Sequence, residues 1–359
     1  MQAKENWLRT VEFRYPEWIP SKLRCFPAVW QAYREDLEAV FLDHPRVVPG
    51  FQKGNIRFDD MPSGYRRGER LVDKWGCVRV TLQDGVAGQM IEHPLADWSA
   101  LATYVPPDPL QGGLDPITRG LDAYMTGRVE PLAWPEVEVR AQAQKARGEL
   151  VEGDGEKLLD RLYFLRGFEN LMLDFATEPP QLARLFAMLE EYELKLIGKW
   201  LSLGVDVISF HTDFATQYGL MMSPRSFRKY LKPLFAHLFR PCRQAGVHVV
   251  LSSDGRTVDI VDDLIECGVS VQDPQVRPNT VAGIAAAYKG KLCASVDLDQ
   301  QGFPFMTPGQ MRDHIREVVD TLAMPEGGLM LTATFYDPNT PLCNIEAAAR
   351  AFEDFCFPD

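Results

Sequence analysis

Short apolar runs alternate with amphipathic helical patterns through the second half of the chain. Leu182, Leu185 and Leu189 recur at the three- and four-residue intervals that place side chains on one face of a helix. The same spacing predicts helices over residues 182–200, 224–240 and 308–322. Between and after them, β-branched runs predict strands over residues 205–210, 247–251, 269–272, 291–296 and 328–334.

The predicted helices have recognisable ends. Ser223-Pro224 and Thr307-Pro308 combine an N-cap side chain with proline in the first turn, where its missing N–H costs nothing. Glycine closes several helices before the next strand, because it adopts the left-handed conformation of a C-cap without strain. These closing glycines are Gly204, Gly246, Gly268 and Gly290.

Alternating strands and helices imply parallel βαβ units, which build either a barrel or an open, doubly wound sheet. No GxGxxG or GxxxxGK[ST] turn follows any strand, which removes the main argument for a nucleotide-binding open sheet. We therefore expect an α/β fold of the (β/α)8 TIM-barrel type, one domain overall. Residues 1–70 form a cap of helices and loops, residues 71–359 form the barrel, and 71–110 hold a hairpin and a helix over 97–104.

Composition narrows the function classes. A net charge of −12 and a sequence pI of about 5.1 disfavour nucleic acid as a partner, because phosphate binding needs a clustered basic surface. The N-terminal stretch has no apolar signal segment, and no run is long enough to span a membrane. Seven widely spaced cysteines without a CxxC motif indicate a reducing compartment. We expect a cytoplasmic protein with no membrane association.

Carboxylates follow four successive predicted strands. Asp213, Asp254, Asp273 and Asp297 each lie at or just past a strand end. In a barrel these ends converge on the face where active sites form. Crowded carboxylates raise one another's pKa, so they can hold protons near neutral pH. An aspartate after a strand can instead cap a helix or a turn, and that alternative stays open for each one.

Other polar residues near these strand ends are candidates for the same site. His211 could act as acid, base or ligand, or could be a structural histidine. Trp75 could supply an apolar wall or belong to the core. We take His211, Asp213, Asp254 and Asp297 as candidate catalytic residues. The candidate substrate-binding residues are Trp75, Gln217, Ser253, Asp273, Gln275 and Tyr336.

Metal motifs are missing from the sequence, which contains no HxxxH, HExxH or CxxC. Cys293 and Asp297 share a strand face, but four residues at ~3.3 Å each separate them by ~13 Å, too far to share one ion. Cys293 is better placed as a core residue. Whether a metal binds remains open at this point.

Several short motifs occur in a fixed order along the chain, among them the segments 73–78 (DKWGCV), 93–98 (HPLADW), 165–170 (LRGFEN), 223–233 (SPRSFRKYLKP) and 340–345 (TPLCNI). In order and spacing they resemble the uroporphyrinogen decarboxylase superfamily, in particular its corrinoid-dependent methyltransferases. The resemblance implies a TIM barrel, a methyl-bearing substrate and a corrinoid carried by a separate partner protein. Decarboxylases of this family hold substrate carboxylates through an RQAGRY-type segment, of which this chain has only an echo near Arg34.

The family's zinc methyltransferases carry a His-x-Cys-Gly motif, which aligns here with the segment 252–255. Ser252 replaces the histidine and Asp254 the cysteine, so the resemblance does not imply a thiolate zinc site. It favours transfer of a methyl group from a small O- or N-methylated compound, preferably a methoxylated aromatic, to a corrinoid-binding protein. A homodimer is possible.

Two other functions remain open. A decarboxylase-type lyase would need cationic side chains to hold carboxylates, and Arg256 and Arg277 are the nearest at these strand ends. A catalytically silent ligand-binding barrel would explain the replaced zinc ligands. The crowded carboxylates argue against the silent barrel, because such crowding is costly without a use.

Overall fold

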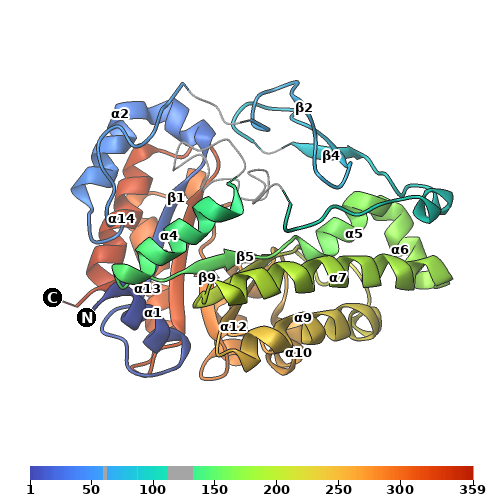
Figure 1. The fold of residues 1–359 in the computed structure, drawn as a ribbon. Helices are drawn as coiled ribbons and strands as arrows, with labels where there is room; N and C mark the ends of the chain where they lie inside the picture. The colour runs from blue at the N-terminus through green and yellow to red at the C-terminus, as the bar shows by residue number, and fades with distance from the viewer. Residues whose placement is uncertain (60–62, 87, 112–131, 359) are drawn as a thin grey trace.

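The computed structural model describes residues 1–59, 63–86, 88–111 and 132–358. Their main element is a curled sheet of seven parallel strands with helices packed on its outside (Figure 1). In spatial order the strands are β1 (Ser21–Cys25), β10 (Leu329–Phe335), β9 (Cys293–Asp297), β8 (Val271–Gln272), β7 (His248–Ser252), β6 (Val207–His211) and β5 (Glu152–Asp154).

The order of the strands is that of an arc of a barrel. From β5 to β10 each strand pairs in parallel with the one before it in sequence, so the arc grows by successive crossover connections. The first strand, β1, then pairs with β10 at the other end. Within the described ranges, no pairing joins β1 to β5. The expected eight-stranded barrel is therefore found as a seven-stranded curled sheet, because no described strand fills the gap between these edges.

Helices occupy the connections between strands and the two ends of the chain. No helix in the described part of the chain is long and apolar enough to cross a membrane. The longer helices are α1 (Ala3–Val11), α2 (Pro27–Asp43), α4 (Trp134–Ala146), α5 (Leu158–Arg166), α6 (Phe168–Thr177), α7 (Pro180–Ser202), α9 (Lys232–Gln244), α10 (Val261–Cys267), α12 (Val281–Tyr288), α13 (Pro308–Leu322) and α14 (Leu342–Cys356). The shorter ones are η1 (Trp98–Ala102), α8 (Pro224–Ser226), η2 (Phe227–Leu231), η3 (Val258–Ile260), α11 (Val276–Asn279) and η4 (Phe303–Phe305).

The strand and helix predictions for the second half are confirmed to within a few residues. All five predicted strands coincide with β6–β10 within two residues at each end, and the helix predicted over 308–322 is α13. Thr307 caps α13 through a complete capping box with Gln310. The four glycines predicted to close helices all have positive φ, from +63° to +94°. Local sequence signals therefore dictate this half of the fold.

The first half differs from expectation in three places. The segment 1–70 contributes strand β1 to the main sheet in addition to helices and loops. The predicted hairpin has a third strand, giving an antiparallel sheet of β2 (Arg70–Val72), β3 (Val78–Val80) and β4 (Gln89–Glu92). The helix predicted over 97–104 is the shorter η1, capped by the Asp97 carboxylate, which accepts from the Ser99 N–H at 2.8 Å.

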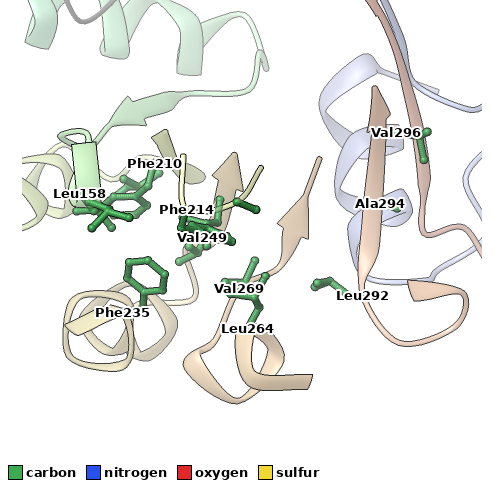
Figure 2. Close-up of a cluster of buried hydrophobic side chains, with 14 of the residues drawn as sticks. Leu158, Phe210, Phe214, Phe235, Val249, Leu264, Val269, Leu292, Ala294 and Val296 are labelled. Carbon is green, nitrogen blue, oxygen red and sulfur yellow. The ribbon is translucent and has the colours of Figure 1, made fainter. Parts of the chain in front are cut away.

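Successive side chains of the main sheet alternate between an outer, apolar face and an inner face. The outer face packs under the helices, where Phe210 of β6 and Val249 of β7 lie near Phe235 of α9 (Figure 2). The inner face carries a second apolar cluster toward the amino ends of the strands, which joins β8, β9 and β10 to helix α1. That cluster contains Val11, Val271, Cys293 and Met330, with Trp7 and Val250 packed against it.

Polar residues replace the apolar ones on the inner face toward the carboxyl ends of the strands. Thr332 follows Met330 at the next inner position of β10, and its register partner on β9 is Asp297. Cys293 is fully buried at the apolar level, as expected of a core residue. The inner face thus has an apolar floor closed by α1 and a polar mouth at the carboxyl ends.

Candidate active site

Three of the four predicted aspartates are joined into one hydrogen-bonded network at the mouth. The Asp254 N–H donates to the Asp213 carboxylate at 3.0 Å, which ties the loop after β7 to the loop after β6. The Gln275 side-chain amide then donates to the Asp254 carboxylate at 2.9 Å. The backbone of Gln275 also bridges to Asp297 at the end of β9. Residues predicted from separate strand ends are therefore brought together here.

Gln275 and Asn279 fix the loop that carries Asp254. The buried Gln275 side chain accepts a hydrogen bond from the Gly255 N–H at 2.9 Å. Asn279 donates to the carbonyls of Gly255 and Gln275 at 2.9 and 2.8 Å. A carboxylate at the tip of this loop is thereby held at a defined position, as a catalytic group requires.

Asp273 lies deeper, between β7 and β8. Its carboxyl accepts from the Ser252 hydroxyl at 2.5 Å and from the Ser253 N–H at 2.9 Å. Burial raises the pKa of Asp273 well above its usual value, with a further contribution from the charges of Asp297 and Asp254. The hydrogen bonds from the two serines only partly oppose this rise. The net effect favours the protonated, uncharged form of Asp273.

Asp254 and Asp297 also hold their protons more strongly than ordinary aspartates. The Asp254 side chain reaches solvent at the mouth, yet desolvation, followed by the charges of Asp213 and Asp160, raises its pKa to about 6. Desolvation followed by the charge of Asp254 raises the pKa of Asp297 to about 7. The crowding expected from the sequence is present, since the charge of Asp254 contributes to the raised pKa values of Asp297 and Asp273.

Asp297 has one further property. Its Oδ1 atom is buried and has no hydrogen-bond partner in the described part of the chain. A buried carboxyl oxygen without a partner is costly, so it usually has a use. The atom is available to a bound molecule.

Asp160 belongs to the site but carries no sequence signal that we recognised. It lies in the first turn of α5, where its carboxylate accepts from the Asp213 N–H at 2.8 Å and from the Tyr163 hydroxyl. Burial and the charge of Asp213 raise the pKa of Asp160, while Lys157 opposes the rise. The preceding strand β5 is only three residues long and has no apolar run. The sequence therefore does not indicate a strand end just before Asp160.

Arg24 of β1 is the second residue that the sequence analysis missed. Its register partner is Thr334, which shares the inner face of β10 with Thr332, the partner of Asp297. The positive charge of Arg24 lowers the pKa values of both Asp297 and Tyr336, opposing the larger effect of burial. A cation therefore lies on the wall of the mouth.

The remaining candidates lie in different surroundings. His211 is exposed and ends β6 opposite Ser252, so it lies on the inner face at the mouth. Gln217 is exposed in the following loop. Tyr336 is 45% exposed, and burial of its hydroxyl together with the charges of Asp297 and Asp254 raises its pKa.

Trp75 lies in a buried cluster beside the small antiparallel sheet. It is 1% exposed, and its indole N–H donates to Glu156 at 2.8 Å. Arg161 pairs with both Glu156 and Asp73 in the same cluster. This placement favours the alternative of a core tryptophan, because no site carboxylate named above contacts it.

The donor set does not fit a thiolate zinc site. All seven cysteines are free, and every one except Cys343 is buried. Across the described ranges, no three His, Cys, Asp or Glu side chains are grouped so that they could hold a metal ion. Ser252, where the zinc enzymes have histidine, is already hydrogen-bonded to Asp273. The residues present therefore do not supply the ligands of that zinc site.

The chain belongs to the uroporphyrinogen decarboxylase (URO-D) family, whose model matches residues 162–355, more than half of the sequence. Among solved structures, the chain is similar to a methyltransferase from Methanosarcina mazei, with a TM-score of 0.60 and 15% identity over 98% of both chains. At that identity the likeness establishes the fold. The expected resemblance to this family is thus confirmed.

A second solved structure, described as an IOLI protein with a bound zinc atom, covers 61% of this chain and 92% of its own. Its TM-score is 0.31 at 11% identity, which is too low to carry an argument. No curated protein sequence matches the chain.

Proposed function

We propose that this protein transfers a methyl group from a small O- or N-methylated substrate, preferably a methoxylated aromatic, to a corrinoid carried by a partner protein. Family membership and the likeness to an archaeal methyltransferase support the class of reaction. The observation that carries the proposal is the pair of protonatable carboxyls, Asp254 and Asp297, at the mouth. We also propose that the curled sheet closes into the (β/α)8 barrel typical of this family.

The chemistry explains why such carboxyls are needed. The methyl acceptor is the second substrate, and it supplies the nucleophile. As the methyl–oxygen bond breaks, its electron pair stays on oxygen, and an unprotonated phenoxide or amine is a poor leaving group. An acid with a pKa near 7 is protonated at neutral pH and can still give up its proton, which suits it to general acid catalysis. Asp297 has that pKa and a buried oxygen without a partner.

The neighbouring residues then have supporting roles. Asp254 raises the pKa of Asp297 by its charge, and Gln275 fixes Asp254 and lies beside Asp297. Asp213 holds the backbone of Asp254 and is itself held by Asp160. His211, Gln217, Ser253, Asp273 and Tyr336 remain candidates for contacts with the substrate.

The proposal is tested with 3-methoxybenzoate labelled with ¹³C in its methyl group and with reduced cobalamin as a stand-in acceptor. Label is expected on cobalt, with an equal amount of 3-hydroxybenzoate formed. Asp297→Asn is expected to slow the transfer by roughly 10²- to 10³-fold, because the proton donor is removed. Asp262→Asn, a change at an exposed side chain on α10, is the matched control and should leave the rate unchanged.

A decarboxylase-type lyase is the second candidate, and Arg24 favours it, since a cation at the mouth could hold a carboxylate. The cations expected for that role from the sequence are already paired. Arg256 contacts Asp259, and Arg277 contacts Asp299 through two hydrogen bonds of 2.7 Å. Release of CO₂ from the carboxyl carbon of the same compound, with the methyl label retained, would identify a lyase.

A further inference from the structure

Arg24 faces the interior of the curled sheet rather than its helices. Its neighbours in β1, Leu23 and Cys25, are buried in the outer core, so the alternation of the strand places Arg24 on the inner face. Arg24 is half-buried. Its partner on β10 is Thr334, which lies two residues beyond Thr332, the partner of Asp297, toward the carboxyl ends of the strands. The guanidinium therefore projects from the wall of the mouth.

Within the described residues, the charge of Arg24 has no counter-ion. Among the described residues, no ion pair or hydrogen bond involves its side chain, whereas Arg256 and Arg277 at the same end are both paired. Partial burial of a guanidinium without a partner costs free energy. Guanidinium groups bind carboxylates through two parallel hydrogen bonds, so a carboxylate is the natural partner.

The nearby carboxyls do not prevent an anion from binding. Asp273 and Asp297 have raised pKa values, and burial is the largest cause in both. The raised pKa of Asp273 favours its uncharged form, and Asp297 is about half protonated around neutral pH. The unpartnered Oδ1 of Asp297 offers a second contact for the same molecule, and no ion pair joins Asp297 to Arg24 among the described residues. A substrate can thus bind between the cation and the acid.

Aromatic surface lies beside this cation. Phe26, two residues after Arg24, packs against Tyr336 with ring centroids 4.0 Å apart and a 43° angle between the rings. Tyr336 is 45% exposed, so part of this surface remains open to a bound molecule. Aromatic side chains pack well against a flat ring and accept tilted or offset stacking.

We infer that Arg24 binds a carboxylate of the substrate, and that the substrate is a methoxylated aromatic acid whose ring lies against Phe26 and Tyr336. That the substrate carries a methyl group rests on the proposed function. That it is an aromatic acid rests on Arg24, Asp297 and the pair of Phe26 and Tyr336. Arg24 then determines the specificity for a substrate acid. Binding of the carboxylate by Arg24 directs the methyl group of the substrate toward Asp254 and Asp297.

Calorimetric binding of 3-methoxybenzoate and 3-methoxybenzamide to the purified full chain tests this inference. The two compounds have nearly the same shape, but only the first is charged. The wild type should bind the acid about 10- to 100-fold more tightly than the amide, as expected for one charge-assisted contact. Arg24→Gln should abolish this preference and Arg24→Lys should keep part of it. Arg240→Gln, at an exposed position of α9, should leave it unchanged.

Equal affinity for acid and amide, or a preference that survives in Arg24→Gln, would overturn the inference, and so would the absence of binding to either compound. The wild-type comparison decides the matter even if the Arg24 variants fail to fold. Because binding is measured without a methyl acceptor, failure of this inference can be distinguished from failure of the proposed methyl transfer. Selective binding of the acid without any methyl transfer would leave the role of Arg24 standing and contradict only the proposed reaction.

Discussion

At Asp297, a pKa of about 7 makes the protonation state of the proposed acid depend on pH within the physiological range. The donor works only while protonated, so kcat/KM for methyl transfer should be constant below about pH 6 and fall above about pH 7. A pH–rate profile of the wild type and of Asp297→Asn measures this. The variant should lack the descending limb, and a limb that persists in it would assign the titration to another group.

The same carboxyl has a predictable effect on stability. Its folded-state pKa is raised, so its contribution to the free energy of unfolding is fully present below the unfolded pKa and is lost as pH rises through about 7. Asp297→Asn should therefore be more stable than the wild type at about pH 8, by up to roughly 4 kcal/mol, and similar to it at about pH 4. Urea denaturation at both pH values tests this, and equal stability at the higher pH would contradict the burial of an ionisable carboxyl there.

Gly255 is the residue on which the geometry of the Asp254 loop depends. Its φ is +91°, and an added Cβ would lie 2.6 Å from the backbone of Ala215 and Thr216. Gly255→Ala should therefore cost about 2–4 kcal/mol and displace Asp254. Gly50→Ala is the matched control, because Gly50 has φ of +78° but nothing within 4 Å of the added atom.

The control should lose only about 1 kcal/mol, the cost of the backbone conformation. Denaturant titration of both variants gives the comparison. Similar losses for the two glycines would mean that the close approach of the two loops is not maintained in solution.

At the scale of elements, the sequence predicts the main-sheet strands that contain a run of apolar residues and misses β1 and β5, which lack one. β10 is almost wholly buried and was found within one residue at each end. β1 was missed because Lys22 and Arg24 interrupt its apolar positions, and β5 because it reads Glu-Gly-Asp. Arg24 is one of the residues that interrupt β1, and it also lies on the wall of the mouth, so a residue that obscures a strand can belong to the site.

The site itself was predictable in part for a related reason. Asp254, Asp273 and Asp297 follow recognisable strands, and parallel strands must bring their carboxyl ends to one edge. Asp160 and Arg24 lie on or near the two missed strands, so no periodicity pointed to them. Trp75 was predictable as buried but not as a partner of Glu156, because that contact joins residues 81 positions apart.

For the whole molecule, the curled sheet separates two environments. Helices cover its apolar outer face, α1 closes the inner floor, and the polar inner mouth holds Arg24 and the protonatable carboxyls. Fold alone does not decide between methyl transfer and decarboxylation within this family, since function depends on the site. Arg24, which has no counter-ion among the described residues, fits a substrate with one carboxylate. The acids that hold protons beside it fit a leaving group that must be protonated.

The most direct test of this account is to follow the ¹³C-labelled methyl group of 3-methoxybenzoate with the wild-type protein and reduced cobalamin. The account predicts that the label appears on cobalt as 3-hydroxybenzoate accumulates, and that Asp297→Asn transfers it far more slowly. Label that stays on the aromatic compound, under conditions in which the protein binds it, would contradict methyl transfer.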